Sequence, residues 1–271
     1  MLSGDGLQLF HRRWEPDSSP RAVCLLVHGL AEHSGRYEEL ARVLTDRRFS
    51  VWALDQRGHG RSEGRRGDCL GFSRFVDDLR TLAEQARIKA PGLPQAVIGH
   101  SLGGFIALAY ATQFADWVQA VAVSSPALKL THRPPALEVA MVHLLARLIP
   151  IFPFPNGVNP SLLSHDLKAV ESYRTDPLVH RVITARCAES VDQAMKEALD
   201  LAPALKVPCL ILQAGEDEIC DPEASARFAR LVKQAPVTFR RYDGMYHELF
   251  NEIERERVIR DLCAWLEEVL G

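Results

Sequence analysis

The sequence predicts an α/β protein with a mostly parallel central sheet and helices on both faces. Signals for strands and for helices alternate along most of the 271 residues. Several strand candidates are short, continuous apolar runs, which are typical of parallel strands covered on both faces. In addition, a glycine-flanked serine, Ser101, stands between such a run and an apolar segment with helical character.

The alternation gives the order of the elements along the chain. Residues 7–14 alternate in polarity and predict an early antiparallel strand. Further strands are expected at 22–27, 50–54, 95–100, 118–123, 207–212 and 237–242. Helices are expected at 37–47, 75–89, from 105 onward, at 223–233 and at 252–270. The alternation stops between 126 and 202, so we expect residues 1–125 and 203–271 to form the sheet domain and 126–202 to form an inserted, mainly helical cap.

The first half of the insertion is unusually apolar. Between residues 137 and 154 only Glu138, His143 and Arg147 interrupt the apolar side chains. A helix that is apolar on all sides must be buried or must face an apolar partner. One interpretation is a helix packed between the sheet domain and the rest of the insertion. The other is a cap whose outer face touches lipid and whose inner face lines an acyl pocket, and both can hold at once.

Composition excludes some functions. The net charge of −3 gives no field that favours nucleic acid or anionic membranes. The six cysteines have no metal-type spacing, so we expect neither a metal nor a cofactor, and a reduced, cytoplasmic setting is the simpler interpretation. The first residues lack a basic flank followed by an apolar run, so no signal peptide is expected. No apolar stretch approaches the roughly 20 residues of a spanning helix.

The pattern Gly-x-Ser-x-Gly occurs twice. Around Ser62 it lies in a charged, glycine-rich segment with no strand before it and no apolar helix after it, which indicates a loop. Around Ser101 an apolar strand precedes the serine and a helical run follows it, which is the context of a nucleophile elbow. Gly99 and Gly103 remove side chains that would collide in the tight, strained turn. We therefore interpret Ser101 as a catalytic nucleophile.

A serine nucleophile needs a base, and the base needs an acid that orients it. His247 follows the last predicted strand, at the sheet edge where such proteins build their sites, and is the predicted base. The acid is expected after the strand at 207–212, and Asp217 directly follows the turn there. Asp221 precedes a proline and is better explained as a helix N-cap. The remaining acids of this loop, Glu216 and Glu218, are expected to be solvated.

The other groups of the site follow from the same positions. An oxyanion hole requires two amides, and we assign them to the backbone N–H of Leu102, directly after the nucleophile, and of Leu30, which follows a buried strand and Gly29. The earlier histidines, His28, His33 and His100, flank the site and are expected to be structural or to line it.

Four segments together resemble the monoacylglycerol lipase / lysophospholipase family of α/β hydrolases, over about residues 4–266. They are HGLAEHSGRY at 28–37, GHGRSEG at 58–64, GHSLGG at 99–104 and YRTDPL at 173–178. The resemblance implies the α/β-hydrolase fold and carries over Ser101, Asp217 and His247 as a catalytic triad.

The same resemblance implies a cap that admits an acyl chain and a polar pocket for glycerol. Glu32, Arg36 and Tyr173 match the residues that line this pocket, and Cys220 matches a cysteine near the site. Phe250 departs from the family, since the animal monoacylglycerol lipases have a histidine there that contacts glycerol.

Two classes of function are therefore predicted. The first is a serine hydrolase of monoacylglycerols that acts through an acyl-enzyme, with a lysophospholipase or a broad short-chain carboxylesterase as the alternative. The second is a ligand-binding module that keeps the pocket without turnover. The expected partner is a small lipid ester, together with weak peripheral contact of the cap with membranes. The sequence leaves the acyl-chain length, the headgroup and the oligomeric state open.

Overall fold

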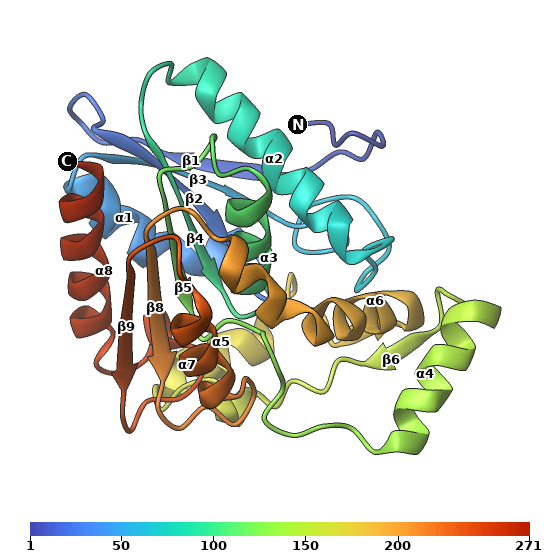
Figure 1. The fold of residues 1–271 in the computed structure, drawn as a ribbon. Coiled ribbons are helices and arrows are strands. Elements are labelled where there is room, and N and C mark those ends of the chain that lie inside the picture. Colours follow the sequence, from blue (N-terminus) through green and yellow to red (C-terminus); the bar gives the residue numbers. More distant parts are fainter.

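The computed structural model describes residues 1–271. A twisted seven-stranded sheet forms the centre of the molecule, in the order β1-β3-β2-β4-β5-β8-β9 (Figure 1). β1 pairs antiparallel with β3, and every other pairing is parallel. The strands are β1 His11–Trp14, β2 Ala22–Val27, β3 Phe49–Leu54, β4 Gln95–His100, β5 Ala120–Ser124, β8 Cys209–Ala214 and β9 Val237–Tyr242.

The predicted fold class is thus confirmed. Strands β2, β4 and β9 have the predicted limits, and the limits of the other strands differ by at most four residues. The largest difference is in β1, which begins at His11 rather than at residue 7. Upstream, Gln8 makes only an isolated antiparallel bridge with Leu2. β5 and β8 each begin two residues later than predicted and extend further.

Two hydrophobic clusters lie on the two faces of the sheet because each central strand is buried on both sides. In β2, Leu25 and its alternate neighbours belong to one cluster, whereas Cys24 and Leu26 belong to the other. Helices α2 Phe72–Lys89, α3 Leu102–Gln113 and α7 Pro222–Leu231 cover the first face. Helices α1 Glu38–Asp46 and α8 Arg255–Leu270 cover the second, and they lie together on the left of Figure 1.

The insertion between β5 and β8 is mainly helical. It contains α4 Ala136–Leu148, α5 Leu167–Thr175 and α6 Ala185–Lys196, and a small two-stranded sheet of β6 Pro153–Pro155 and β7 Val182–Thr184. Four 3-10 helices complete the chain: η1 Ser34–Tyr37, η2 Pro160–Leu162, η3 Ala198–Ala204 and η4 Leu249–Asn251. The predicted end of the cap at 202 falls inside η3, which packs against the core helices α3 and α7. The boundaries of a separate cap at 126 and 202 stay a prediction.

Polar contacts join the insertion to the sheet domain at several points. The ring of His33 bonds to Asp176 at 2.9 Å, and that of His165 bonds to Glu252 at 2.8 Å. Asp68 accepts hydrogen bonds from Arg186, at the start of α6, and from Thr184. These contacts hold α5 and the start of α6 against the core.

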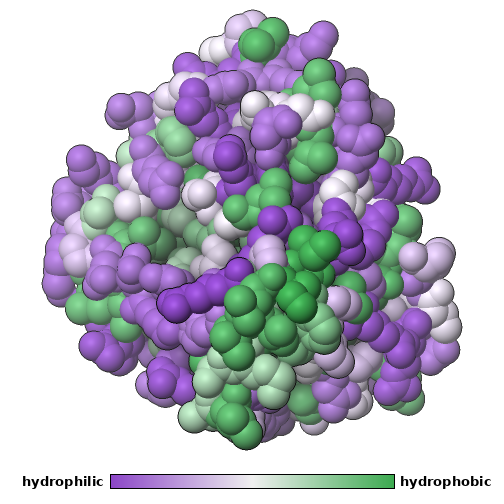
Figure 2. Space-filling view, turned by 90° about the vertical axis from the view of Figure 1, so that its right-hand side faces the viewer, coloured by the Kyte–Doolittle hydropathy of each residue, from purple (hydrophilic) through white to green (hydrophobic).

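Helix α4 is the exception. It projects from the molecule at the lower right of Figure 1, and α6 is its main packing partner. No residue of α4 is buried, and Leu144 and Leu148 are 57% and 68% exposed. Figure 2 shows the corresponding apolar patch in green at the lower centre of this face. The interpretation of 137–154 as a buried helix is therefore wrong for the single chain, and the helix itself ends at Leu148 because the following residues turn into β6.

No helix of the molecule combines the length and the apolar character that crossing a membrane requires.

Candidate active site

The turn between β4 and α3 holds Ser101 in a strained conformation, with φ of 53° and ψ of −121°. A non-glycine residue with positive φ is uncommon and persists only where its surroundings enforce it. Here the surroundings are glycines. A Cβ on Gly99 would lie 2.2 Å from the carbonyl oxygen of Gly103, and a Cβ on Gly103 would lie 2.1 Å from that of Val27. Close approach of these backbones therefore fixes Ser101 at the tip of the turn.

His247 and Asp217 meet at the carboxyl ends of the neighbouring strands β8 and β9. Nδ1 of His247 lies 3.0 Å from Oδ1 and 2.9 Å from Oδ2 of Asp217. Oδ1 also accepts the amide hydrogens of Ile219 and Cys220, at 3.0 and 2.9 Å. Burial would raise the pKa of Asp217, but His247 and these amides lower it overall. An ionised Asp217 keeps the proton of His247 on Nδ1, which leaves Nε2 for chemistry.

A narrow cavity of about 30 Å³ lies beside Ser101 and His247. Its lining is mixed, with apolar side chains (Leu30, Val158, Leu163 and Ile219) and polar ones (Glu32, His100, Tyr173 and Glu248). Val158, Leu163 and Tyr173 belong to the insertion. Three residues of the insertion therefore line the cavity beside the nucleophile, where polar and apolar groups meet.

The amides predicted for the oxyanion hole have no acceptor within the protein. Neither the N–H of Leu30 nor that of Leu102 donates a hydrogen bond, and Leu102 is the first residue of α3, where helical amides lack intrahelical acceptors. Gly29, next to Leu30, is close to the nucleophile, since a Cβ there would lie 3.3 Å from that of Ser101. The two unpaired amides thus come from two separate segments, the loop after β2 and the turn directly after the nucleophile.

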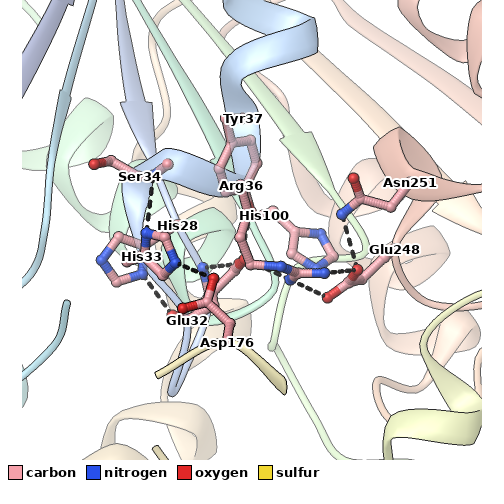
Figure 3. A network of polar contacts seen from close by, with 12 residues as sticks. His28, Glu32, His33, Ser34, Arg36, Tyr37, His100, Asp176, Glu248 and Asn251 are labelled. Atoms are coloured by element: carbon pink, nitrogen blue, oxygen red, sulfur yellow. Dashed lines mark hydrogen bonds and ion pairs between the residues drawn. The ribbon is translucent and has the colours of Figure 1, made fainter. Parts of the chain in front are cut away.

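Arg36 is placed differently from the pocket-lining role that the resemblance implied. Its guanidinium does not line the cavity but lies between the carboxylates of Glu32 and Glu248 (Figure 3). Glu32 and Tyr173 do line the cavity, and the ring of Tyr173 covers the guanidinium at 4.9 Å. Burial would raise the pKa of Glu32, but Arg36 and other neighbours lower it to about 2. Arg36 therefore holds two carboxylates in place instead of facing a ligand.

Glu248 was not predicted from the sequence. Its side chain lines the cavity and receives two hydrogen bonds from Arg36, which is 212 positions away in the chain. The one available signal was its position directly after His247, at the sheet edge where the site lies.

The three earlier histidines have structural partners, as expected. Nε2 of His28 accepts the amide hydrogen of Gln56, so its Nδ1–H donates to the carbonyl of Gly29. The ring of His100 lies 4.7 Å from that of His247, and burial and this neighbour lower the pKa of His100 to about 4. His100 is therefore neutral near pH 7.

Other residues singled out from the sequence take the alternative roles considered for them. Ser62 is buried in a loop, where its hydroxyl donates to the carbonyl of Asp55. Asp221 caps α7 through the amide of Glu223, and Glu216 and Glu218 are exposed. Phe250 packs in the cluster beneath α1 and α8 and does not line the cavity.

All six cysteines are free and buried. Cys220 lies nearest to the site, with its Sγ 4.0 Å from Oγ of Ser101. Burial raises the pKa of Cys220 well above its usual value, which keeps the thiol protonated. No group of three or more His, Cys, Asp or Glu side chains is arranged to hold a metal ion.

Comparisons with known proteins identify the family to which the chain belongs. Residues 18–254 match the Hydrolase_4 family, described as serine aminopeptidase, S33. A monoacylglycerol lipase of Mycolicibacterium smegmatis is 35% identical over 96% of this chain and 93% of its own length. The monoglyceride lipase of Homo sapiens is 32% identical over 99% of this chain and 89% of its own.

The crystal structure of the Paleococcus ferrophilus monoacylglycerol lipase superimposes with a TM-score of 0.88. It is 35% identical in sequence, and the match covers 96% of this chain and 98% of that one. Two findings assign the chain to the same family: the match to the family model, and two relatives that are more than 30% identical over nearly the whole chain. The chain therefore belongs to the Hydrolase_4 family of α/β-hydrolase-fold serine hydrolases, and within it to the group that contains the monoacylglycerol lipases.

Proposed function

We propose that this chain, a carboxylic ester hydrolase, cleaves monoacylglycerols into a fatty acid and glycerol by way of an acyl-enzyme. The observation that carries the proposal is the strained Ser101, which lies in one cavity with the imidazole of His247. Asp217 binds the far nitrogen of that imidazole. Nucleophile, base and orienting acid are the three groups that acyl transfer by a serine requires.

The reaction uses these groups in two halves. Oγ of Ser101 attacks the ester carbonyl while its proton moves to Nε2 of His247, and Asp217 stabilises the imidazolium. The amides of Leu30 and Leu102 donate to the oxyanion that forms. His247 then protonates the departing glycerol oxygen as its bond to the carbonyl carbon breaks. In the second half water attacks the acyl carbon while His247 takes its proton. The bond from the acyl carbon to Oγ of Ser101 then breaks, His247 returns the proton to Oγ, and the fatty acid leaves.

The lining of the cavity supports a lipid ester with a small polar alcohol. The carboxylates of Glu32 and Glu248 can accept hydrogen bonds from hydroxyl groups, and the apolar lining suits an acyl chain. The cavity of about 30 Å³ is much smaller than the several hundred Å³ of typical ligand pockets. We infer that the insertion acts as a cap that moves to admit the substrate.

The exposed α4 supports a weak peripheral contact with membranes or micelles. Its apolar side chains form the patch in Figure 2, and a contact of this kind would grow with the apolar area it buries. Six free thiols fit a reducing compartment such as the cytoplasm. We therefore propose a cytoplasmic enzyme that visits lipid surfaces through α4.

Hydrolysis rates across a panel of esters test the proposed function. Monoacylglycerols of increasing chain length, lysophospholipids and p-nitrophenyl esters are compared, with Ser101→Ala as the inactive control. We expect the highest kcat/KM on monoacylglycerols. A preference for lysophospholipids would make the protein a lysophospholipase, and activity on short activated esters alone would make it a broad carboxylesterase. Ligand binding without any turnover would favour the binding module instead.

A further inference from the structure

We propose that Glu248 determines the charge of the headgroup that the enzyme accepts. By neutralising Arg36 it leaves the polar side of the cavity with a net negative charge, so that neutral alcohols enter and phosphate-bearing headgroups are refused. The inference rests on the proposed ester hydrolysis and specifies the substrate class of that same site.

The contacts make Glu248 and Arg36 a tightly fixed pair (Figure 3). Arg36 donates from both terminal nitrogens to Glu248, at 2.6 and 2.7 Å, and its Nη1 also donates to Glu32 at 2.7 Å. Bidentate pairs of this kind are strong and geometrically specific. The side chains of Arg36, Glu248 and Glu32 are 8%, 5% and 3% exposed. Arg36 is thus enclosed by the two carboxylates and is not presented to a ligand.

The other partners fix the two carboxylates on the cavity wall. Glu32 accepts hydrogen bonds from the amide of Gly29 and the hydroxyl of Tyr37, at 2.6 and 2.7 Å. Glu248 accepts a hydrogen bond from the side-chain amide of Asn251 at 2.8 Å. Both glutamates line the cavity beside Ser101, whereas Arg36 does not.

The charges around this part of the cavity do not cancel. Glu32 and Glu248 contribute two negative charges, and Arg36 contributes one positive charge. His100 is neutral because its pKa is lowered to about 4. In the active form His247 is neutral as the base, so the charge of its partner Asp217 adds to the negative side. The pKa of Glu32, at about 2, keeps that carboxylate ionised at every working pH. If Glu248 carried no charge, the negative charge of Glu32 and the positive charge of Arg36 would cancel.

This excess of negative charge selects between two kinds of headgroup. A glycerol headgroup carries hydroxyl donors, and the carboxylates can accept their hydrogen bonds. A phosphate brings negative charge and acceptor oxygens to the same carboxylates, and like charges repel strongly where water is excluded. In a cavity whose one nearby guanidinium is already paired, no cation remains to offset this repulsion.

The test compares two substrates that differ only in the phosphate: 1-oleoylglycerol and 1-oleoyl-lysophosphatidate, both presented in the same neutral detergent micelles. The readout is the ratio of kcat/KM for lysophosphatidate to that for oleoylglycerol. In the wild type we expect a ratio far below one. In Glu248→Gln, which keeps the size of the side chain and removes its charge, we expect the ratio to rise roughly tenfold or more.

Three further variants separate charge from structure. Glu248→Asp keeps the charge and is expected to retain the wild-type ratio. Glu216→Gln removes a charge from an exposed side chain that has no partner, and it is expected to leave the ratio unchanged. In the double variant Glu248→Gln/Arg36→Gln the gain is expected to disappear, because Arg36 is the cation that Glu248→Gln uncovers. A loss of fold would lower both rates together and would not move the ratio.

The possible results are distinct. A wild-type ratio near one would overturn the inference without any variant. An unchanged ratio in a folded Glu248→Gln protein that still cleaves oleoylglycerol would overturn it as well, and would leave the proposed function standing. Absence of oleoylglycerol turnover in the wild type would overturn the proposed function and this inference with it.

Discussion

Nδ1 of His247 lies within 3.0 Å of both carboxylate oxygens of Asp217, and both side chains are buried. Burial by itself would lower the pKa of His247, but the adjacent carboxylate raises it above the usual value of 6.5. A general base must be neutral to accept a proton. We therefore expect kcat/KM on a soluble ester to fall on the acid side with an apparent pKa above 6.5. A fall centred below 6.5 would contradict the coupling of the two groups.

Replacement of the acid tests its assignment. Asp217→Asn is expected to lower kcat about a thousandfold or more, because the asparagine no longer stabilises the imidazolium and disturbs the tautomer of His247. Asp221→Asn is the matched control, because asparagine caps α7 about as well as aspartate. Steady-state rates and circular dichroism of both proteins are the measurements. An inactive Asp221→Asn with an active Asp217→Asn would show that the acid has been misassigned.

Covalent labelling tests the nucleophile. A fluorophosphonate is expected to label Ser101, and Ser101→Ala is expected to lose the label and several orders of magnitude in turnover. Ser62→Ala is expected to keep the label. It will have a lower melting temperature, because the buried hydroxyl of Ser62 bonds to the carbonyl of Asp55 and to the amide of Phe10. Peptide mass spectrometry locates the adduct, and an adduct on Ser62 would refute the assignment.

The exposed face of α4 predicts a hydrophobic contact with lipid that salt does not weaken. Leu144→Glu or Leu148→Glu is expected to lower activity on long-chain monoacylglycerol dispersions and to spare a soluble short-chain ester. Co-sedimentation with neutral vesicles at low and high salt measures the attachment directly. Equal losses on both substrates, with an unchanged bound fraction, would show that α4 contributes to the fold rather than to the lipid contact.

His180 predicts a loss of stability in acid. His180 is half-buried, but both of its ring nitrogens are shielded from solvent and lack a hydrogen-bond partner, and the ring lies 4.6 Å from that of His59. Burial, aided by Arg66, lowers the pKa of His180 to about 4. The unfolded chain, with a pKa near 6.5, therefore binds more protons than the folded chain between pH 6.5 and 4, so stability falls as the pH decreases through this range.

His180→Leu removes that proton uptake. The variant is expected to lose less of its unfolding free energy than the wild type between pH 7 and pH 5, by an amount on the order of 1 kcal/mol. Urea unfolding at the two pH values measures the difference. Identical pH dependence in both proteins would show that His180 is not the titrating group.

The parts of the fold and site that depend on neighbours in the sequence were predictable. Ser101 lies in a motif whose strand and helix are adjacent to it, and the parallel sheet follows from continuous apolar runs such as residues 22–27. The chain order of the fold family pointed to Asp217 and His247, which the structure brings together. Their catalytic roles stay predictions, as do those of the amides of Leu30 and Leu102.

The remaining features depend on residues that are distant in the sequence. Arg36 was expected to line the pocket, but its guanidinium does not line the cavity and is paired with Glu248, a residue 212 positions away in the sequence. Nothing near Arg36 indicates this partner. The exposure of α4 also could not be read from its apolar pattern, because such a pattern is typical of a buried helix as well as of one that faces lipid.

The polar contacts of the insertion divide it into parts with different freedom. Asp176 and His165, close to the two ends of α5, bond to His33 and Glu252, respectively. Arg186, at the start of α6, bonds to Asp68. By contrast, α4 packs mainly on α6. A rigid swing of the whole insertion would break all three of these contacts, whereas α4 can shift without breaking any of them. Backbone amides of α4 will then exchange with deuterium much faster than those of α5, and a lipid surface will slow exchange in α4 alone.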